Sequence, residues 1–508
     1  MDELFLEVIE KESNLVNKKR LGNANKDKNE QFFTPLNVAS YMGSMFKETK
    51  QKVIYFLDPG AGIGNLTAAF IATVCKWSKK PQKIIATLYE VDSTLIPDLQ
   101  KNVEEFVSMC SKNDIVLEVR IENTDFIQGA IDELNQEIKN RYDYIIINPP
   151  YKKMSSSSFD KKITSKVGIN VPNYYAAFVS LSIRLMNEKG QLVFITPRSF
   201  CNGQYFKSFR YDLLGNTKIE KIHNFISRKD IFYDDVLQET VIFFITKNKQ
   251  KLNNNIEIRE SGKSDFSQIT KLKKRFDNIV FPHDQEKIIR IIKDDDIDIV
   301  EKMHSLPNSL EELGINVSTG PIVDFREKEG LLTFQGTLFS IPIIYPENFI
   351  DGFIQWPFKG KKPQYLKKHS SNAMGLRPPG FYVLVKRFSS KEEEKRIVAA
   401  VYSSKMIGST EVAFDNKTNY YHISKEGLYS EEFAKGLSLY LNSSLVDFYF
   451  RTFSGSTQVN VSDLKSIKYP SYKSLIEIGK SYDQVIPDQK ELDRIVDKVL
   501  YSTKETTS

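Results

Sequence analysis

The chain has 508 residues, of which 41% are hydrophobic and 12% aromatic, so it can bury sizeable cores and lacks the composition of a disordered protein. A net charge of +6 and a pI near 8.7 do not by themselves indicate a nucleic-acid-binding protein. The three widely spaced cysteines exclude a disulfide framework, and neither a signal peptide nor a membrane-spanning run is visible, so we expect a soluble, cytoplasmic protein of about two to four domains.

The first 250 residues alternate between short β-rich runs and helical patterns. Residues 1–30 predict an N-terminal helical arm that ends in a polar stretch. The β-rich runs lie at 53–57, 84–88, 115–119, 144–147, 192–195 and 241–245, with helical patterns between them at 66–77 and 174–186. This alternation predicts an α/β domain over 31–250, built on a doubly wound parallel sheet that is covered on both faces.

The chain changes character after residue 250. We predict a polar linker over 251–300 and an irregular α+β domain over 301–508, which ends in an amphipathic helix at 489–501. Residues 358–407 hold 12 Lys and Arg against 3 Asp and Glu, with aromatic residues among them. Such a run is typical of a surface that contacts phosphates and bases, or of a solvated face over a small core.

A glycine-rich segment follows the first predicted strand. In Asp58-Pro59-Gly60-Ala61-Gly62-Ile63-Gly64 the glycines permit a tight turn and the close approach of a ligand to the backbone, although a purely structural turn has the same composition. The spacing is not that of a dinucleotide fingerprint, and the carboxylate of Asp58 suits a cationic ligand better than a pyrophosphate.

Acidic residues end the next two predicted strands. Glu90 can accept hydrogen bonds from ribose hydroxyls, and Asp125 can accept one from an adenine amino group, with Phe126 packed on the ring. Each acid alone is more often a solvated strand end. Because open α/β sheets bind ligands at the carboxyl ends of their strands, three successive strand ends of this kind indicate a nucleoside-containing ligand.

The tetrapeptide Asn148-Pro149-Pro150-Tyr151 directly follows the apolar strand 144–147. Its two prolines stiffen the loop and remove two backbone donors. The Asn148 side-chain oxygen and the Pro149 carbonyl can each accept one hydrogen of a planar amino group, and Tyr151 offers a ring face for stacking. The competing interpretation is a strand-ending turn with an exposed tyrosine.

Taken together, these segments resemble the gamma-class N6-adenine DNA methyltransferases of type II restriction–modification systems over about residues 28–245. In that class a Thr-Pro motif, here Thr34-Pro35, precedes the glycine-rich loop, the Asn-Pro-Pro-Tyr loop and a target-recognition domain. The resemblance implies a fold of the S-adenosylmethionine-dependent methyltransferase type and S-adenosyl-L-methionine as the cofactor. The cofactor-binding residues implied are Thr34, Pro35, Asp58, Pro59, Gly60, Gly62, Glu90, Asp125, Phe126 and Phe178.

The resemblance also implies catalytic roles and partners. Asn148, Pro149, Pro150 and Tyr151 would act on an adenine flipped out of duplex DNA, with the base held between Tyr151 and a second aromatic residue. We favour Phe232 for that residue, and Tyr233 is the alternative. No metal site is expected. The implied protein is a monomeric methylase of a prokaryotic cytoplasm, which acts beside a separately encoded restriction endonuclease.

The second half has looser matches to recognition domains. Residues 317–320 resemble the opening of such domains, and 441–444 with 455–461 resemble a segment near their end. From the basic run we expect Arg377, Lys386 and Arg387 to contact DNA. The sequence does not indicate which bases are read.

The sequence is also compatible with other functions. Enzymes that methylate protein glutamine or an RNA base share the tetrapeptide, although they are generally shorter. Enzymes that methylate cytosine N4 more often have serine at the position of Asn148. A non-catalytic DNA specificity subunit would not need an intact loop, acids and tetrapeptide, and we find no nuclease constellation.

Overall fold

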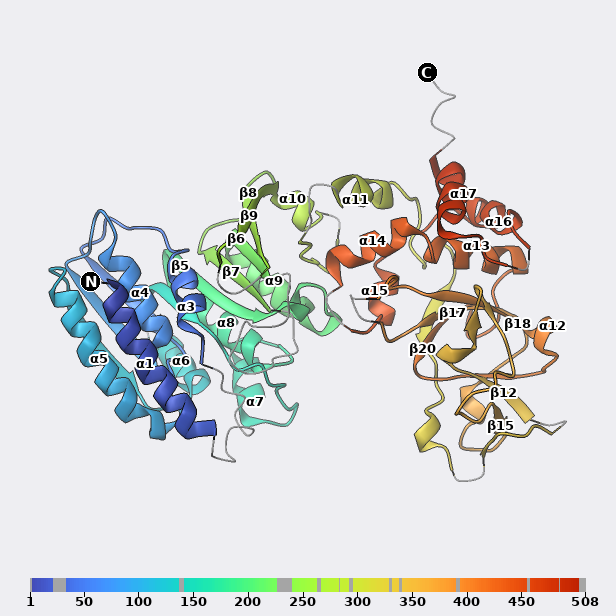
Figure 1. Cartoon of the computed structure of the whole chain (residues 1–508), viewed down its shortest axis with the longest axis horizontal. Helices are drawn as coiled ribbons and strands as arrows, with labels where there is room; N and C mark the ends of the chain where they lie inside the picture. The colour runs from blue at the N-terminus through green and yellow to red at the C-terminus, as the bar shows by residue number, and fades with distance from the viewer. Residues whose placement is uncertain are drawn as a thin grey trace, which may run out of the picture. The chain divides into compact units, whose positions relative to one another are not determined.

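The computed structural model describes residues 2–21, 33–136, 141–225, 240–262, 266–282, 284–291, 296–328, 331–337, 340–389, 393–454, 457–483 and 485–501. The chain divides into two compact units, residues 1–291 and residues 292–508. Figure 1 shows the elements of each unit along the chain.

A nine-stranded sheet in the order β3-β2-β1-β4-β5-β7-β6-β8-β9 forms the centre of the first unit. Its strands are β1 (Val53–Asp58), β2 (Lys83–Tyr89), β3 (Val116–Glu122), β4 (Tyr142–Ile147), β5 (Met186–Pro197), β6 (Lys218–Phe225), β7 (Thr240–Thr246), β8 (Asn255–Ser261) and β9 (Ile269–Arg275). The chain starts at β1 in the middle of the sheet, builds outward to β3, and then crosses to β4 on the other side. The predicted doubly wound α/β class is confirmed.

The sheet is mixed, whereas the sequence predicted parallel strands throughout. β1 to β5 are parallel to one another, but β7 runs antiparallel to both β5 and β6. The apolar run at 241–245 could not reveal this, because a strand that is covered on both faces has the same composition in either direction.

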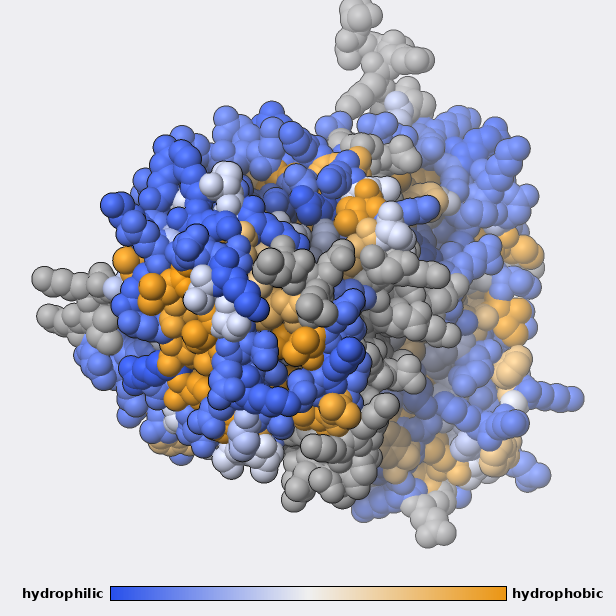
Figure 2. All heavy atoms as spheres, turned by 60° about the vertical axis from the view of Figure 1, so that its left-hand side comes forward, coloured by the Kyte–Doolittle hydropathy of each residue, from blue (hydrophilic) through white to orange (hydrophobic). Residues whose placement is uncertain are grey.

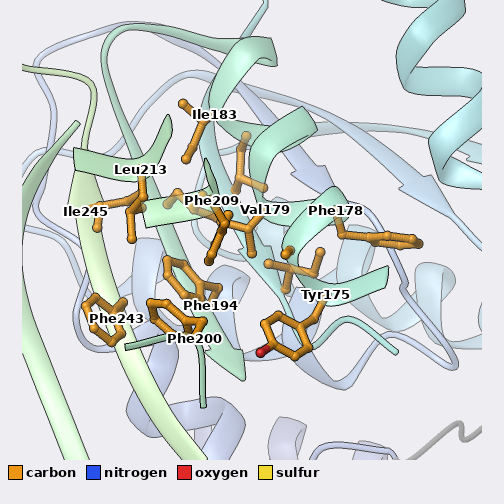
Figure 3. Close-up of a cluster of buried hydrophobic side chains, with 14 of the residues drawn as sticks. Tyr175, Phe178, Val179, Ile183, Phe194, Phe200, Phe209, Leu213, Phe243 and Ile245 are labelled. Carbon is orange, nitrogen blue, oxygen red and sulfur yellow. The ribbon is translucent and has the colours of Figure 1, made fainter. Parts of the chain in front are cut away.

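Two hydrophobic cores cover the two faces of the sheet. Alternate side chains of β5 enter different cores: Val193 and Ile195 enter one, and Leu192 and Phe194 the other. The first core packs against α1 (Asp2–Leu21), α3 (Leu36–Gly43), α4 (Asn65–Cys75) and α5 (Ile96–Ser111), and the second against α6 (Phe126–Asn135), α8 (Tyr174–Leu185) and α9 (Lys207–Asn216). Figure 3 shows part of the second core, with Phe178 at one edge of the cluster.

The N-terminal helix is part of the domain and not a separate arm. Phe5, Ile9 and Val16 of α1 are buried, and α1 lies alongside α4 and α5 (Figure 1). The amide of Asn65 in α4 donates a hydrogen bond of 3.0 Å to the hydroxyl of Ser13 in α1. An amphipathic helix buries its apolar stripe against a partner, and here the partner is the helical layer over the sheet.

The predicted linker over 251–300 is wrong for most of its length. β8 and β9 extend the sheet beyond β6, and α10 (Phe276–Ile279) follows them within the first unit, which ends at residue 291. In β9 only Lys274 is buried, and the other residues are exposed or half-buried, as expected of an edge strand. The polar composition that suggested a linker is therefore that of a sheet edge.

The second unit contains a six-stranded sheet in the order β10-β20-β17-β18-β14-β13 and a five-stranded sheet in the order β11-β15-β12-β19-β16. Its strands are β10 (Asn316–Thr319), β11 (Leu332–Thr333), β12 (Ser340–Ile344), β13 (Phe349–Ile350), β14 (Phe353–Ile354), β15 (Tyr365–Lys367), β16 (Leu376–Arg377), β17 (Phe381–Lys386), β18 (Ala399–Ser403), β19 (Val412–Phe414) and β20 (Thr418–His422). Its helices are α11 (Asp296–His304), α12 (Ser404–Ile407), α13 (Glu431–Leu441), α14 (Ser444–Phe453), α15 (Val461–Lys465), α16 (Tyr472–Lys480) and α17 (Gln489–Tyr501).

Helices α13 and α16 cross at close range in this unit. A Cβ atom on Gly436 would lie 1.8 Å from the carbonyl oxygen of Leu475, and one on Gly479 would lie 1.8 Å from that of Glu432. The crossing therefore requires glycine on both helices.

The face of the molecule drawn in Figure 2 is mainly hydrophilic. On the face drawn in Figure 2, polar and charged residues cover most of the area, and hydrophobic residues emerge in separate areas among them. Among the helices of the described ranges, none combines the length and the apolar composition needed to cross a membrane.

Candidate active site

A pocket opens where strands β1, β2, β3 and β4 end, at the carboxyl edge of the parallel part of the sheet. It encloses about 900 Å³, part of which is open to solvent. Its lining residues are Phe33, Pro59, Gly60, Gly62, Tyr89, Glu90, Val91, Leu95, Thr124, Asp125, Phe126, Asn148, Pro149, Pro150, Tyr151, Lys152, Tyr174 and Phe178. Three strand-end segments and the tetrapeptide, which the sequence singled out separately, meet in this one pocket.

The glycine-rich loop forms one wall. Gly62 has a φ of +57°, in the left-handed region, and a Cβ atom there would lie 2.9 Å from the ring of Phe33. A Cβ on Gly60 would meet nothing within 4 Å, since Gly60 borders open space. The loop thus presents backbone to the pocket, as a loop that cradles a ligand must.

Asp58 lies behind this loop and does not line the pocket. Its side chain is fully buried, accepts a hydrogen bond of 2.8 Å from the Thr67 hydroxyl, and receives the backbone N–H of Gly60 at 3.4 Å. Burial raises the pKa of Asp58 to about 7. Asp58 thus shapes the loop from behind, and its predicted contact with a cationic ligand stays a prediction.

Glu90 follows β2 and is held by two backbone donors. The N–H of Gly62 donates to one carboxylate oxygen at 2.8 Å, and the N–H of Asp92 donates to the other at 2.7 Å. Glu90 is buried yet lines the pocket. These bonds fix its orientation and tie the end of β2 to the glycine-rich loop.

Asp125 and two phenylalanines form the opposite wall. Asp125 caps α6, where its Oδ1 accepts the N–H groups of Ile127 at 2.8 Å and Gln128 at 3.3 Å. Within the described residues, its Oδ2 has no hydrogen bond, and burial raises its pKa. The ring centroids of Phe126 and Phe178 lie 5.0 Å apart. The wall therefore offers one acceptor beside two apolar rings, whose planes are tilted by 49° against each other.

The tetrapeptide directly follows β4, which ends at Ile147. The Asn148 Nδ2 atom donates a hydrogen bond of 3.1 Å to the hydroxyl oxygen of Thr34. Tyr151 packs edge-on against Tyr175, with ring centroids 6.4 Å apart, and burial raises the pKa of its hydroxyl. All four residues of the tetrapeptide line the pocket.

Thr34 and Pro35 lie beside the pocket but are not among its lining residues. Thr34 is buried, and its carbonyl oxygen accepts a hydrogen bond of 2.9 Å from the Asn65 amide. Pro35 precedes the first turn of α3. The cofactor contact predicted for both residues stays a prediction. Thr34 also touches Asn148, which the sequence could not indicate across 114 positions.

The sequence analysis missed several lining residues. Phe33 and Tyr89 adjoin predicted site residues, and Lys152 directly follows the tetrapeptide. The Lys152 Nζ atom lies 4.7 Å from the ring centroid of Tyr174, whose hydroxyl donates to Asp160 at 2.6 Å. Their position next to the motifs in the sequence was the signal that could have identified these three residues as pocket-lining. Phe232 and Tyr233, the candidates for the second stacking aromatic, lie outside the described residues.

One of the three predicted DNA contacts in the second unit is wrong. Arg377 is buried, and its guanidinium donates to the Tyr420 hydroxyl at 2.8 Å and to the carbonyl of Leu376 at 2.7 Å. It therefore supports the fold of that unit. Lys386 and Arg387 are half-buried, and Arg387 donates to the carbonyl of Asn416 at 3.1 Å.

The pocket suits S-adenosyl-L-methionine in the kinds of group that it presents. Oriented carboxylates at Glu90 and Asp125 can accept from ribose hydroxyls and from an adenine amino group. The rings of Phe126 and Phe178 can cover a purine face, and the open space at Gly60 leaves room at the glycine-rich loop. The predicted residues that line the pocket offer groups that fit the cofactor, whereas Asp58, Thr34 and Pro35 do not line it.

Comparison with known proteins agrees with this geometry. Residues 43–232 match the family described as Eco57I restriction-modification methylase. The chain is 41% identical to the type II methyltransferase M.BsuBI of Bacillus subtilis, across 94% of this chain and 95% of that protein. It is 36% identical to the type II methyltransferase M.PstI of Providencia stuartii, across 92% of each chain. The chain therefore belongs to the type II methyltransferases of restriction–modification systems, and is a DNA methyltransferase that uses S-adenosyl-L-methionine.

Proposed function

We propose that this methyltransferase modifies the exocyclic N6 nitrogen of an adenine that is flipped out of duplex DNA. The observation that carries the proposal is the hydrogen bond from Asn148 Nδ2 to Thr34. This bond fixes which end of the amide is the nitrogen, and an amide oxygen has two lone pairs with which it can accept a hydrogen from a substrate amino group.

The tetrapeptide supplies a second acceptor beside the first. Proline has no N–H, so the Pro149 carbonyl can accept without a competing donor from its own residue. Two acceptors match the two hydrogens of a planar amino group and draw its nitrogen toward tetrahedral geometry, which exposes the lone pair. The ring of Tyr151 offers a face on which the base can stack.

The cofactor, when bound, supplies an electrophilic methyl group. We assign its ribose to Glu90, its adenine to Asp125, Phe126 and Phe178, and its remaining part to the loop at Pro59, Gly60 and Gly62. Thr34, Pro35 and Asp58 would act indirectly, because they support the loop and Asn148. An adenine must leave the helix to enter such a pocket, at a cost of a few kcal/mol, which base contacts must offset.

We assign target recognition to the second unit. Exposed apolar side chains in it support this role: Met374 is 91% exposed and Phe325 75% exposed. Their segments are joined by a hydrogen bond of 3.3 Å from Asn372 to Glu327. Apolar side chains of this kind can wedge between base steps, beside the lysines of the basic run. Phe232 as the second stacking residue, a monomeric state and a separately encoded endonuclease belong to the same proposal.

The experiment is to express the gene in a host that lacks DNA methylation and to sequence its DNA by a single-molecule method. The proposal predicts N6-methyladenine at one short recurring sequence. Gly62→Asp serves as the control, because the side chain would meet the ring of Phe33 and crowd the loop, so no mark should appear. N4-methylcytosine at the recurring sequence would refute the proposed target.

A further inference from the structure

A dense group of lysines follows the catalytic tetrapeptide. Residues 152–166 contain five lysines and one acidic residue, a net charge of +4 in a chain whose total is only +6. The segment includes α7 (Phe159–Lys166), an eight-residue helix. Its lysines are Lys152, Lys153, Lys161, Lys162 and Lys166. We call Lys153, Lys162 and Lys166, which are all exposed, the lysine face.

No carboxylate neutralises the lysine face. Within the parts of the chain that the structure describes, none of its three lysines forms an ion pair or a hydrogen bond through its side chain. The one acidic residue of the segment, Asp160, accepts the hydroxyl of Tyr174. Lys162 and Lys166 are four residues apart on α7, where like charges repel each other. The arrangement is therefore unfavourable for an isolated protein and becomes favourable beside a polyanion.

The lysine face is anchored to the rim of the catalytic pocket. Lys152, next to Lys153, lines that pocket. The N–H of Met154 donates to the carbonyl of Pro172 at 3.0 Å, and Lys153 pairs with Asn173, the residue that caps α8. Ser158 caps α7 by accepting the N–H of Lys161 at 3.2 Å. The lysines thus sit on a supported segment at a fixed place beside the site.

We propose that the lysine face binds the sugar–phosphate backbone of the duplex beside the base that enters the pocket. This inference rests on the proposed function, since it takes duplex DNA as the substrate. Lysine contacts to phosphate position a duplex without reading its sequence. The face would therefore hold the DNA at the pocket whichever base sequence the second unit selects. Phe159, 62% exposed on the first turn of α7, would lie along the same backbone.

The test compares two triple variants. The first is Lys153→Gln, Lys162→Gln and Lys166→Gln. The matched control is Lys50→Gln, Lys52→Gln and Lys112→Gln, which removes the same charge from exposed lysines that precede β1 and β3. Those positions lie at the amino ends of the strands, at the sheet edge opposite the pocket. Binding of a 30-base-pair duplex of random sequence is measured over a series of salt concentrations.

We expect the slope of log affinity against log salt to become shallower by about 0.9 for each phosphate that the protein no longer neutralises, up to about 2.7 for the lysine-face variant. The control should keep the slope of the wild-type protein. Both variants should bind S-adenosyl-L-methionine as the wild-type protein does, which verifies that the catalytic domain is folded. For a second duplex, which contains the methylated sequence, the lysine-face variant should lose affinity relative to the wild-type protein by the same factor as for the random duplex.

Equal slopes for the two triple variants would overturn the proposal, as would a decrease confined to the methylated sequence. A larger decrease for duplex RNA than for duplex DNA would also contradict it. The proposed function is judged separately, by the identity of the methylated base made by the wild-type protein. If the lysine-face proposal is refuted, the assignment of adenine as the target is unaffected. If the methylated base is not adenine, the lysine-face proposal is still judged by the salt dependence of DNA binding.

Discussion

The hydrogen bond between Thr34 and Asn148 leads to the sharpest prediction about catalysis. Thr34→Val replaces a hydroxyl by a methyl group of similar size, which removes the acceptor for Asn148 Nδ2 at 3.1 Å. A neutral hydrogen bond contributes about 0.5–1.5 kcal/mol net, and 1.4 kcal/mol corresponds to about tenfold in rate. If the bond serves to keep the Asn148 oxygen directed at the substrate, kcat should fall about 2- to 12-fold.

The assay is single-turnover methylation of duplex DNA with labelled cofactor, together with calorimetric measurement of cofactor binding. Thr34→Val should lower the rate of methyl transfer and leave the cofactor Kd unchanged, because Thr34 does not line the pocket. Thr34→Ser keeps the hydroxyl and should restore the rate. An increase in the cofactor Kd at an unchanged rate would refute this reasoning and favour the direct cofactor contact that the sequence suggested.

Three further changes test other parts of the site. Asn148→Ala should lower kcat about 100-fold or more at an unchanged cofactor Kd, by analogy with the loss of one preorganised polar group from an active site, as measured by single-turnover methylation. Tyr151→Ala should cost about 1–3 kcal/mol of base stacking in kcat/KM, whereas Tyr151→Phe should keep most of the activity; equal losses would show that the hydroxyl matters instead. For Asp58, the pKa in the folded protein is about 7, above its usual value of 3.8, so the folded state binds more protons than the unfolded state between about pH 4 and 7. The free energy of unfolding of the wild-type protein should therefore fall, relative to that of Asp58→Asn, as the pH rises through this window, and the difference should be constant above it. Parallel stability curves for the two proteins, obtained by denaturant unfolding, would contradict the assignment.

The sequence could predict the ligand-binding edge because its signals are local. The glycine-rich loop, Glu90, Asp125 and the tetrapeptide each follow a strand directly. The carboxyl ends of neighbouring parallel strands meet at one edge of the sheet, so strand order alone brings these residues together. The apolar runs predicted the sheet for the same reason, since strands covered on both faces are continuously hydrophobic.

Features that depend on tertiary packing were beyond the sequence. Asp58 is an acidic residue of the glycine-rich motif, yet it is buried against Thr67 and does not line the pocket. The contact between Thr34 and Asn148 joins two segments far apart in the chain. A similar limit applied to β9, because an edge strand has polar residues on its exposed positions and resembles a loop.

The basic run of the second unit shows that charge alone does not identify a binding surface. Arg377 stands in the most basic stretch of the chain, but its guanidinium is buried beneath Tyr420 and backbone carbonyls. By composition, the lysine face of the first unit is less conspicuous than the run 358–407, which holds more basic residues. Its place distinguishes the lysine face, because Lys152, next to Lys153, lines the catalytic pocket, and Lys153 pairs with Asn173 at the start of α8.

The central claim is that the pocket transfers a methyl group to adenine N6 in duplex DNA. The most direct measurement is to incubate the purified protein with duplex DNA and methyl-labelled cofactor, digest the DNA to nucleosides, and separate them by mass spectrometry. The account predicts label in N6-methyldeoxyadenosine with the wild-type protein and none above background with Asn148→Ala. Label in N4-methyldeoxycytidine, or in RNA or protein offered in the same reaction while the DNA remains unlabelled, would contradict it.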